Sequence, residues 1–261
     1  MKKIFTLTFA FIMSWGVFAQ KPLKSETIVL KGKTNYYEVY GHGEPLLLLH
    51  GYGQSSKYWR SYITDYQDDF KVYLIDLQGF GKSDSFDPDW SIYSVSKTLN
   101  DLLVYLELDS VKAIGLSYGG DVLFQLAKIN PSMVQSMITI GAIGSWNVKD
   151  NPEYIEYFNF SNLENLAWMK DHVTSESQFR AAQDYFTNYA VFLNDKDLQN
   201  IRTKIMIVLG DDDAIPLEEV ARTRKNLPNS DLWILPNTGH LAHEGKNRSK
   251  FISVSKSFLI D

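Results

Sequence analysis

The sequence contains no cysteine, and that absence removes two features from consideration. A lipid anchor on an N-terminal cysteine and a framework of disulfide bonds both need thiols. The chain must therefore be held together by its packed interior. Its 261 residues, of which 44% are hydrophobic, can bury a sizeable core and have the composition of an ordinary globular domain.

Positive charge is also scarce. The chain has 26 lysine and arginine residues against 31 aspartate and glutamate residues, a net charge of -5, and the basic residues form no cluster. Nucleic acids and anionic membrane surfaces are bound by clustered lysine and arginine, so neither is predicted as a partner.

Nucleotide-binding signatures are missing as well, because no segment fits the dinucleotide pattern G-x-G-x-x-G. Gly-Phe-Gly-Lys-Ser at 79–83 resembles the end of a phosphate-binding loop, but Asp76 stands where that motif requires a glycine. We therefore predict no nucleotide cofactor. Internal repeats and low-complexity segments are absent too, which argues against a structural or adhesive role.

One long apolar run lies at the N-terminus. Lys2 and Lys3 precede the apolar residues 4–17, and Ala19 ends a stretch suited to cleavage by a signal peptidase. The run is shorter than the roughly 20 residues of a membrane-spanning helix, so an uncleaved anchor is the less favoured interpretation and no stable membrane insertion is expected. We predict a signal peptide at 1–19, cleavage after Ala19, and a secreted or periplasmic protein.

After Gln20, short apolar runs alternate with longer amphipathic segments, a pattern typical of a sheet covered by helices. Strands are predicted at 26–31, 35–40, 45–49, 70–75, 111–115, 134–140, 201–209 and 231–235, and helices at 91–108, 118–130, 217–226 and 241–259. The uninterrupted leucine run at 45–49 is typical of a strand buried on both faces. We predict an α/β protein with a mostly parallel, doubly wound sheet.

The interval 145–200 breaks this alternation, because it is too long for a crossover between parallel strands and is rich in aromatic residues. These are Trp146, Tyr154, Tyr157, Phe158, Phe160, Trp168, Phe179, Tyr185, Phe186, Tyr189 and Phe192. We predict a helical cap at 145–200, inserted into a core formed by 20–144 and 201–261. Most of the rings are expected to pack the cap, and a minority to line a pocket.

The strongest local motif is Gly-Leu-Ser-Tyr-Gly at 115–119. It follows a predicted strand and precedes a predicted helix, which is the context of a strained turn that exposes a serine nucleophile. Gly115 and Gly119 are needed where side chains would collide with neighbouring backbone. Ser117 would then stand at a helix N-terminus, where the helix dipole favours negative charge.

A serine nucleophile needs a base that takes its proton and an acid that orients the base. Among the five histidines, His240 lies in a loop after the strand at 231–235, at the sheet edge expected for Ser117, and His243 is the second choice. His240, His243 and Glu244 do not match the helical zinc-binding patterns, so we predict no metal site.

Two further loops complete the candidate site. The strand at 201–209 runs into three adjacent aspartates, Asp211, Asp212 and Asp213, and the residues alone leave open which one faces the histidine. At least one of them is expected to cap or solvate the turn. The glycine-rich turn at 50–53 can present the N–H of Tyr52, which with the N–H of Tyr118 would form an oxyanion hole.

These segments together resemble the α/β-hydrolase superfamily over essentially the whole mature chain. The resembling segments are the oxyanion loop at 50–53, the turn after the fourth strand at 76–84, the nucleophile elbow at 115–120, the acid loop at 210–213 and the histidine loop at 239–240. The resemblance implies an eight-stranded sheet with an antiparallel second strand and a cap between strands six and seven. It also selects Asp213 as the acid.

A serine at the elbow favours acyl transfer over epoxide or halide chemistry, for which relatives use an aspartate. We expect a carboxylic ester hydrolase with a catalytic triad of Ser117, His240 and Asp213, acting on small or medium apolar esters and requiring no cofactor. The same residues also suit hydrolysis of amides or N-terminal peptide bonds, carbon–carbon bond hydrolysis and perhydrolysis. A non-catalytic protein that encloses a ligand under the cap is a further interpretation.

Overall fold

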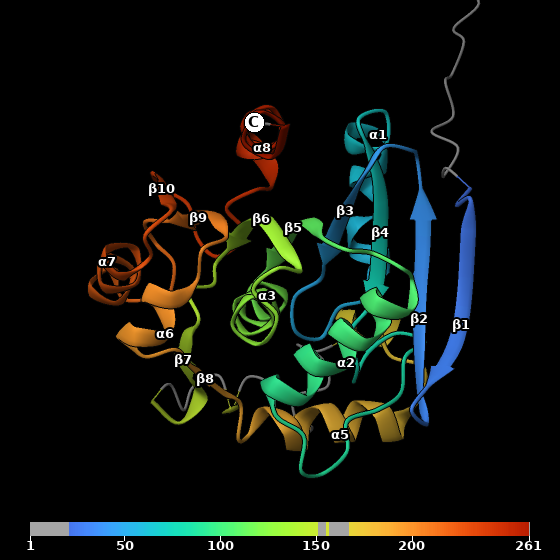
Figure 1. Cartoon of the computed structure of the whole chain (residues 1–261). Coiled ribbons are helices and arrows are strands. Elements are labelled where there is room, and N and C mark those ends of the chain that lie inside the picture. The colour runs from blue at the N-terminus through green and yellow to red at the C-terminus, as the bar shows by residue number, and fades with distance from the viewer. Residues whose placement is uncertain (1–20, 151–154, 157–166, 261) are drawn as a thin grey trace, which may run out of the picture.

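The computed structural model describes residues 21–150, 155–156 and 167–260 (Figure 1). An eight-stranded sheet lies at the centre of this part of the chain. Its strands are β1 (Lys24–Leu30), β2 (Lys33–Tyr40), β3 (Glu44–Leu49), β4 (Phe70–Asp76), β5 (Val111–Leu116), β6 (Val134–Ile140), β9 (Lys204–Gly210) and β10 (Ser230–Leu235). They are ordered β1-β2-β4-β3-β5-β6-β9-β10 across the sheet.

The strand directions match the predicted topology. Strand β2 runs antiparallel to both of its neighbours, β1 and β4, and every other neighbouring pair in this sheet is parallel. The prediction of a mostly parallel eight-stranded sheet with an antiparallel second strand is confirmed. Because the carboxyl ends of parallel strands meet at one edge, the loops that follow β3, β5, β6, β9 and β10 converge there.

Helices cover both faces of the sheet. They are α1 (Ile63–Tyr66), α2 (Ile92–Tyr105), α3 (Tyr118–Ile129), α7 (Leu217–Asn226) and α8 (Arg248–Ile260), with the 3₁₀ helices η1 (Ser56–Tyr62) and η4 (Gly245–Asn247). Figure 1 shows α1 and α8 on one side of the sheet and α2 and α3 on the other. The sheet is therefore the middle of three layers.

The leucine run in β3 shows why both faces need a cover. Side chains alternate between the faces of a strand. Accordingly, Leu46 and Leu48 join a buried cluster with residues of η1, α1 and α8, while Leu47 and Leu49 join the cluster that contains α2 and α3. All four leucines are fully buried. An unbroken apolar run is thus the sequence signature of this central position in the sheet.

The C-terminal helix begins later than predicted. The helix expected at 241–259 is wrong over 241–247, where the chain forms a turn and η4 before α8 starts at Arg248. Gly245 has a φ of 55°, in the left-handed region that a continuous right-handed helix excludes. The turn also carries the side chain of His243 into the core, where it is fully buried.

Between β6 and β9, the described residues form smaller elements outside the main sheet. These are β7 (Ser145–Asn147), η2 (Val148–Asp150), η3 (Ala167–Asp171), α5 (Glu176–Phe186), β8 (Ala190–Phe192) and α6 (Asp195–Asn200). Strands β7 and β8 pair antiparallel in a separate two-stranded sheet. Four of the aromatic residues noted in this interval, Tyr154, Tyr157, Phe158 and Phe160, lie outside the described residues, and the cap boundaries at 145 and 200 stay a prediction.

Within residues 21–150, 155–156 and 167–260, none of the helices combines the length and apolarity needed to cross a membrane. The signal peptide expected at 1–19, with its cleavage after Ala19, lies outside the described residues. Export therefore stays a prediction.

Candidate active site

Ser117 lies between β5 and α3 in a strained backbone conformation. Its φ is 49° and its ψ is -116°, a combination that a residue with a side chain adopts only where the surroundings enforce it. Its N–H donates to the carbonyl oxygen of Ile140 on β6 at 2.7 Å, and its carbonyl accepts the N–H of Gly120 at 2.8 Å. The serine is therefore held at the carboxyl edge of the sheet, at the start of α3.

The glycines around Ser117 allow this turn to pack tightly. A Cβ on Gly115 would come within 2.6 Å of the backbone of Gly119, and a Cβ on Gly119 within 2.7 Å of the carbonyl oxygen of His50. The predicted collisions with neighbouring backbone are confirmed. Any larger residue at either position would force the backbone around Ser117 to shift.

His240 and Asp213 form a hydrogen-bonded pair across two loops. Nδ1 of His240 lies 3.1 Å from each carboxylate oxygen of Asp213. The Asp213 side chain is 2% exposed, whereas the His240 side chain is 45% exposed. The imidazole packs against the backbone of Gly141 after β6, where a Cβ would come within 2.6 Å of its Cε1. With Nδ1 occupied by the carboxylate, Nε2 is the nitrogen left for proton transfer.

The other two aspartates of this loop have different partners. The carboxylate of Asp211 accepts the N–H of Thr238 at 3.1 Å, and backbone hydrogen bonds from Thr238 and Asn237 lower its pKa. The N–H of Asp212 donates to the carbonyl of Thr238 at 3.0 Å. These contacts hold the two loops together, and Asp213 is left facing His240.

These residues share one cavity. It has a volume of about 440 Å³, within the usual range for small-molecule sites, and its lining includes Ser117, Asp213, His240, Gly51, Tyr52, Tyr118, Asp121, Trp146, Trp168, Phe186 and Tyr189. No hydrogen bond joins Ser117 and His240 in the described part of the chain. Such bonds often tighten only when substrate binds, so this geometry is compatible with a serine–histidine pair.

The turn after β3 is fixed by its own side chains. The buried imidazole of His50 donates from Nδ1 to the carbonyl of Gly51 at 2.8 Å and accepts the N–H of Leu77 on Nε2 at 3.0 Å. Burial lowers its pKa to about 4, so the ring stays neutral. The N–H of Gly51 donates to the side-chain oxygen of Gln54 at 2.9 Å. This turn places Tyr52 beside Tyr118, whose N–H is the first of α3 and has no acceptor within the helix.

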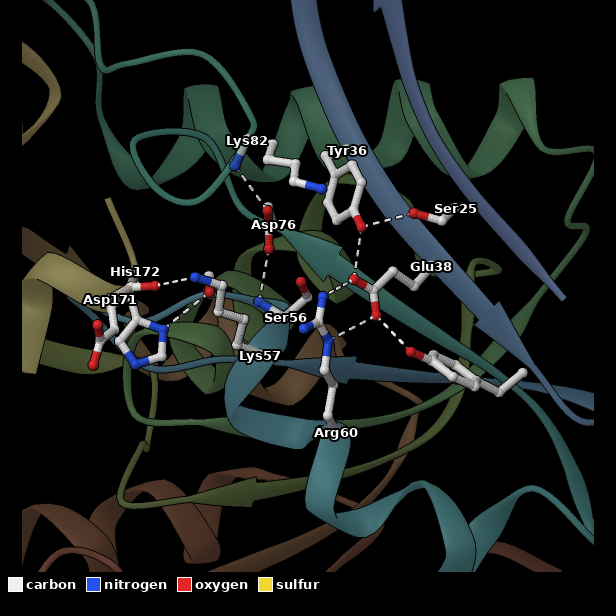
Figure 2. A network of polar contacts seen from close by, with 12 residues as sticks. Ser25, Tyr36, Glu38, Ser56, Lys57, Arg60, Asp76, Lys82, Asp171 and His172 are labelled. Atoms are coloured by element: carbon white, nitrogen blue, oxygen red, sulfur yellow. Dashed lines mark hydrogen bonds and ion pairs between the residues drawn. The ribbon is translucent and has the colours of Figure 1, made fainter. Parts of the chain in front are cut away.

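Asp76 anchors the far end of the same turn (Figure 2). Its carboxylate accepts the N–H of Ser56 at 2.7 Å and the N–H of Lys82 at 2.8 Å. His172, which follows η3, accepts the N–H of Gly81 on its carbonyl at 2.7 Å. The segment that resembles a phosphate-binding loop thus binds the carboxylate of Asp76 and the backbone that follows η3.

Sequence reasoning missed one polar residue of the cavity, Asp121, and did not single out another, Tyr189, among the aromatic residues of 145–200. Asp121 follows Ser117 by four residues, one turn along the same helix, and that spacing is the signal that could have found it. Tyr189 comes from the segment before β8, and nothing local in the sequence distinguishes it from the other aromatic residues nearby. The tertiary structure alone brings its hydroxyl to Asp121, at 2.5 Å.

His243, the second choice as base, does not line the cavity. Its Nε2 lies 2.8 Å from the hydroxyl of Tyr58 in the core. It also does not converge with His240 and Glu244 on a metal position. Among the described residues, no group of three potential histidine, aspartate or glutamate ligands could hold a metal ion.

Comparison with known proteins places this architecture in a family. The family described as alpha/beta hydrolase fold matches residues 44–183, which is more than half of the chain. The chain belongs to the α/β-hydrolase fold family. The matched region of the chain contains the turn after β3, Asp76 and the whole elbow around Ser117.

Similar curated proteins are matched at moderate identity. An uncharacterised protein of Mycobacterium tuberculosis is 33% identical over 113 residues, so the match spans 43% of this α/β-hydrolase and only a third (33%) of that relative. A 2-hydroxy-6-oxo-2,4-heptadienoate hydrolase of Pseudomonas putida is 27% identical over 89% of this chain and 95% of its own. A pimeloyl-[acyl-carrier protein] methyl ester esterase of Proteus mirabilis is 36% identical over 41% of this chain and 40% of its own.

Solved structures share the fold at lower identity. An α/β-hydrolase enzyme from a Medee basin deep-sea metagenome library superposes with a TM-score of 0.76 at 19% identity, covering 90% of this chain and 98% of its own. The carboxylesterase CesB of Bacillus subtilis superposes with a TM-score of 0.74 at 20% identity, covering 91% and 92%. At these identities the likeness establishes the fold.

Proposed function

We propose that this α/β-hydrolase is a serine hydrolase that cleaves carboxylic esters through a triad of Ser117, His240 and Asp213. The observation that carries the proposal is that a strained serine and a carboxylate-bound histidine line one cavity. Strain at a non-glycine residue persists where function requires a fixed geometry. A buried carboxylate on Nδ1 holds the imidazole in the tautomer that a general base needs.

The mechanism follows from these roles. Ser117 Oγ attacks the ester carbonyl while Nε2 of His240 takes its proton, and the N–H groups of Tyr52 and Tyr118 bind the oxyanion. The intermediate collapses to an acyl-enzyme, and the departing alkoxide takes the proton from His240. A water molecule, deprotonated by the same nitrogen, then attacks the acyl-enzyme and releases the carboxylic acid and Ser117.

The cavity lining supports small or medium substrates with apolar parts. Its aromatic residues Trp146, Trp168 and Phe186 surround the elbow, and Ile215 and Leu241 add aliphatic surface. Such a lining lowers the local dielectric constant and so strengthens the hydrogen bonds made inside the site.

Labelling with a fluorophosphonate probe tests the proposal directly. The wild-type protein should be labelled, and Ser117→Ala and His240→Ala should not be. Ser132→Ala, which removes an exposed serine that does not line the cavity, is the control and should label like the wild type. A folded wild-type protein that resists the probe would overturn the assignment and leave a ligand-binding role. If the wild type is labelled, its rates of hydrolysis of p-nitrophenyl esters of increasing chain length define the acyl preference.

We also propose that residues 1–19 direct the protein out of the cytoplasm. The support is the charged and apolar pattern of this segment together with the absence of cysteine. Mass spectrometry of the protein recovered from a secreting host should give the mass expected after cleavage following Ala19. Recovery of the uncleaved chain from the cell interior would contradict this proposal.

A further inference from the structure

The cavity contains a second carboxyl group besides Asp213, and the triad does not use it. Asp121 lies in the first turn of α3 and lines the cavity, yet its side chain and backbone together are only 6% exposed. Its N–H donates to the carbonyl of Ser117 at 3.1 Å. One helical turn, about 5 Å along the axis, therefore separates it from the nucleophile.

The partners of Asp121 leave part of its hydrogen-bonding capacity open. One carboxylate oxygen accepts the hydroxyl of Tyr189 at 2.5 Å, and the other accepts the N–H of Gly144 at 3.2 Å. An ionised carboxylate offers about four acceptor sites, so these two bonds do not saturate it. Both bonds also fix the position of the group at the cavity wall.

Among the described residues that line the cavity, no permanent positive charge balances this carboxylate. The described lining contains no lysine and no arginine, and its one histidine is His240, which is paired with Asp213. A buried carboxylate without a cation is costly, and aromatic rings attract cations through their faces. The cavity therefore favours a positively charged group and disfavours an anionic one.

We infer that the substrates of this enzyme carry a protonated amine, which binds Asp121 among the aromatic rings while Ser117 attacks the ester carbonyl. The inference rests on the proposed function, because it names the substrate class of the same site. It refines the expectation of wholly apolar esters: the substrate needs one cationic group, about one helical turn from the carbonyl.

The ionisation of Asp121 gives this recognition a pH dependence. Burial raises its pKa to about 7, and the hydrogen bonds from Tyr189 and Gly144 oppose that rise. The other titratable groups near it are Tyr118, Tyr185 and His240. The carboxyl group is neutral below this pKa and charged above it. Preference for the amine should therefore increase as the pH rises through about 7.

Two isosteric ester pairs test the inference. In the first pair the amine is in the alcohol part, 2-(dimethylamino)ethyl acetate against 3-methylbutyl acetate. In the second it is in the acyl part, methyl 4-(dimethylamino)butanoate against methyl 5-methylhexanoate. The wild type should prefer the amine in at least one pair, and Asp121→Asn should reduce that ratio of kcat/KM about tenfold or more, the scale of a charge-assisted hydrogen bond. Equal loss on both members would indicate a structural role and overturn the inference.

Tyr189→Phe sharpens the test, because it keeps the carboxylate and removes one bond that lowers its pKa. The amine preference should survive, but its rise with pH should move to higher pH. The ratio is measured from about pH 5.5 to about pH 8, where a tertiary amine stays largely protonated. A pH profile of the ratio that is the same in wild type and Tyr189→Phe would contradict the assignment to Asp121.

Failure of the proposed function is detected separately. Binding of 2-(dimethylamino)ethyl acetate, 3-methylbutyl acetate and both methyl esters is measured by calorimetry on Ser117→Ala, which cannot turn them over. Tighter binding of an amine than of its isostere, lost in Ser117→Ala/Asp121→Asn, would support the inference even if no ester were hydrolysed. Hydrolysis of all four esters without any amine preference would leave the serine hydrolase intact and refute the inference.

Discussion

Two histidines three residues apart, His240 and His243, occupy opposite environments. The side chain of His240 is 45% exposed at the cavity, and its Nδ1 faces the buried carboxylate of Asp213. His243 is fully buried and lies against the rings of Trp59 and Tyr62, with ring centroids 5.3 and 5.7 Å away. The same type of side chain thus lies in a polar site at position 240 and in the core at position 243.

The difference lies in which nitrogen is available. The hydroxyl of Tyr58 donates to Glu244 and can therefore accept from Nε2 of His243. That tautomer leaves Nδ1 as a bare acceptor, without a hydrogen bond in the described part of the chain. Burial lowers the pKa of His243 to about 3, so it stays neutral. A histidine that acts as the base of a triad needs a carboxylate at one ring nitrogen and a second ring nitrogen that the serine can reach. Of these two histidines, His240 meets this requirement and His243 does not.

The largest expected effect is on kcat, which should fall steeply when His240 is replaced and only a little when His243 is replaced. His240→Ala should lower kcat for a p-nitrophenyl ester about 10⁴-fold or more, because the serine loses its base, while the melting temperature changes little. His243→Gln, which can still donate to Tyr58, should keep kcat within about tenfold but lose about 1–3 kcal/mol of stability. Steady-state kinetics and thermal melts provide both readouts. Equal loss of kcat in the two variants would remove the distinction.

Substitutions of the three adjacent aspartates test whether the carboxylate that faces His240 is needed for activity. Asp213→Asn should lower kcat about 10³- to 10⁴-fold, since the amide favours the wrong imidazole tautomer. Asp211→Asn should loosen the loop at Thr238 and lower kcat less than about tenfold. Asp212→Asn is the control, because the Asp212 side chain makes no hydrogen bond or ion pair in the described part of the chain. The measurement is kcat at saturating ester. A larger loss of kcat in Asp211→Asn than in Asp213→Asn would show that Asp213 is not the acid of the triad.

Gly141 tests how closely the imidazole of His240 must be placed. A Cβ in Gly141→Ala would come within 2.6 Å of Cε1 of His240 and should displace the ring, lowering kcat/KM about 10- to 100-fold. Gly245→Ala is the matched control, because its φ of 55° is close to the 60° of Gly141 but no atom lies within 4 Å of the added carbon. Both variants carry similar backbone strain. If the control loses as much activity, the collision with His240 is not the cause.

The last prediction concerns acid stability and not catalysis. The pKa of His243 is lowered to about 3 in the folded state, while the unfolded chain has an ordinary value near 6.5. Its contribution to stability is therefore complete above about pH 6.5 and is lost as the pH falls toward 3, by about 1 kcal/mol per pH unit. Urea unfolding at several pH values should show a shallower acid loss for His243→Gln than for the wild type. Parallel curves would show that His243 does not titrate in this way.

The sequence by itself predicted a mostly parallel sheet and the elbow, whereas the order of the strands came from the structure. Glycines at 115 and 119, the leucine run in β3 and the alternation of apolar and amphipathic segments are local signals, because each reflects backbone conformation or burial within a few residues. The chosen triad residues could also be named from motifs and the resemblance, and the structure brings Asp213 and His240 together. Their catalytic roles remain a proposal, which the labelling experiment and the variants above test.

Only the tertiary structure decided which polar groups meet. Of the three adjacent aspartates, it placed Asp213 against His240. It also buried His243 in the core instead of in a helix beginning at Leu241, and it brought Tyr189, which precedes β8, to Asp121 on α3. Each outcome depends on side-chain directions in loops that are distant in the chain. Those loops meet because parallel strands deliver their carboxyl ends to one edge, and a contact between them has no signature within any single segment.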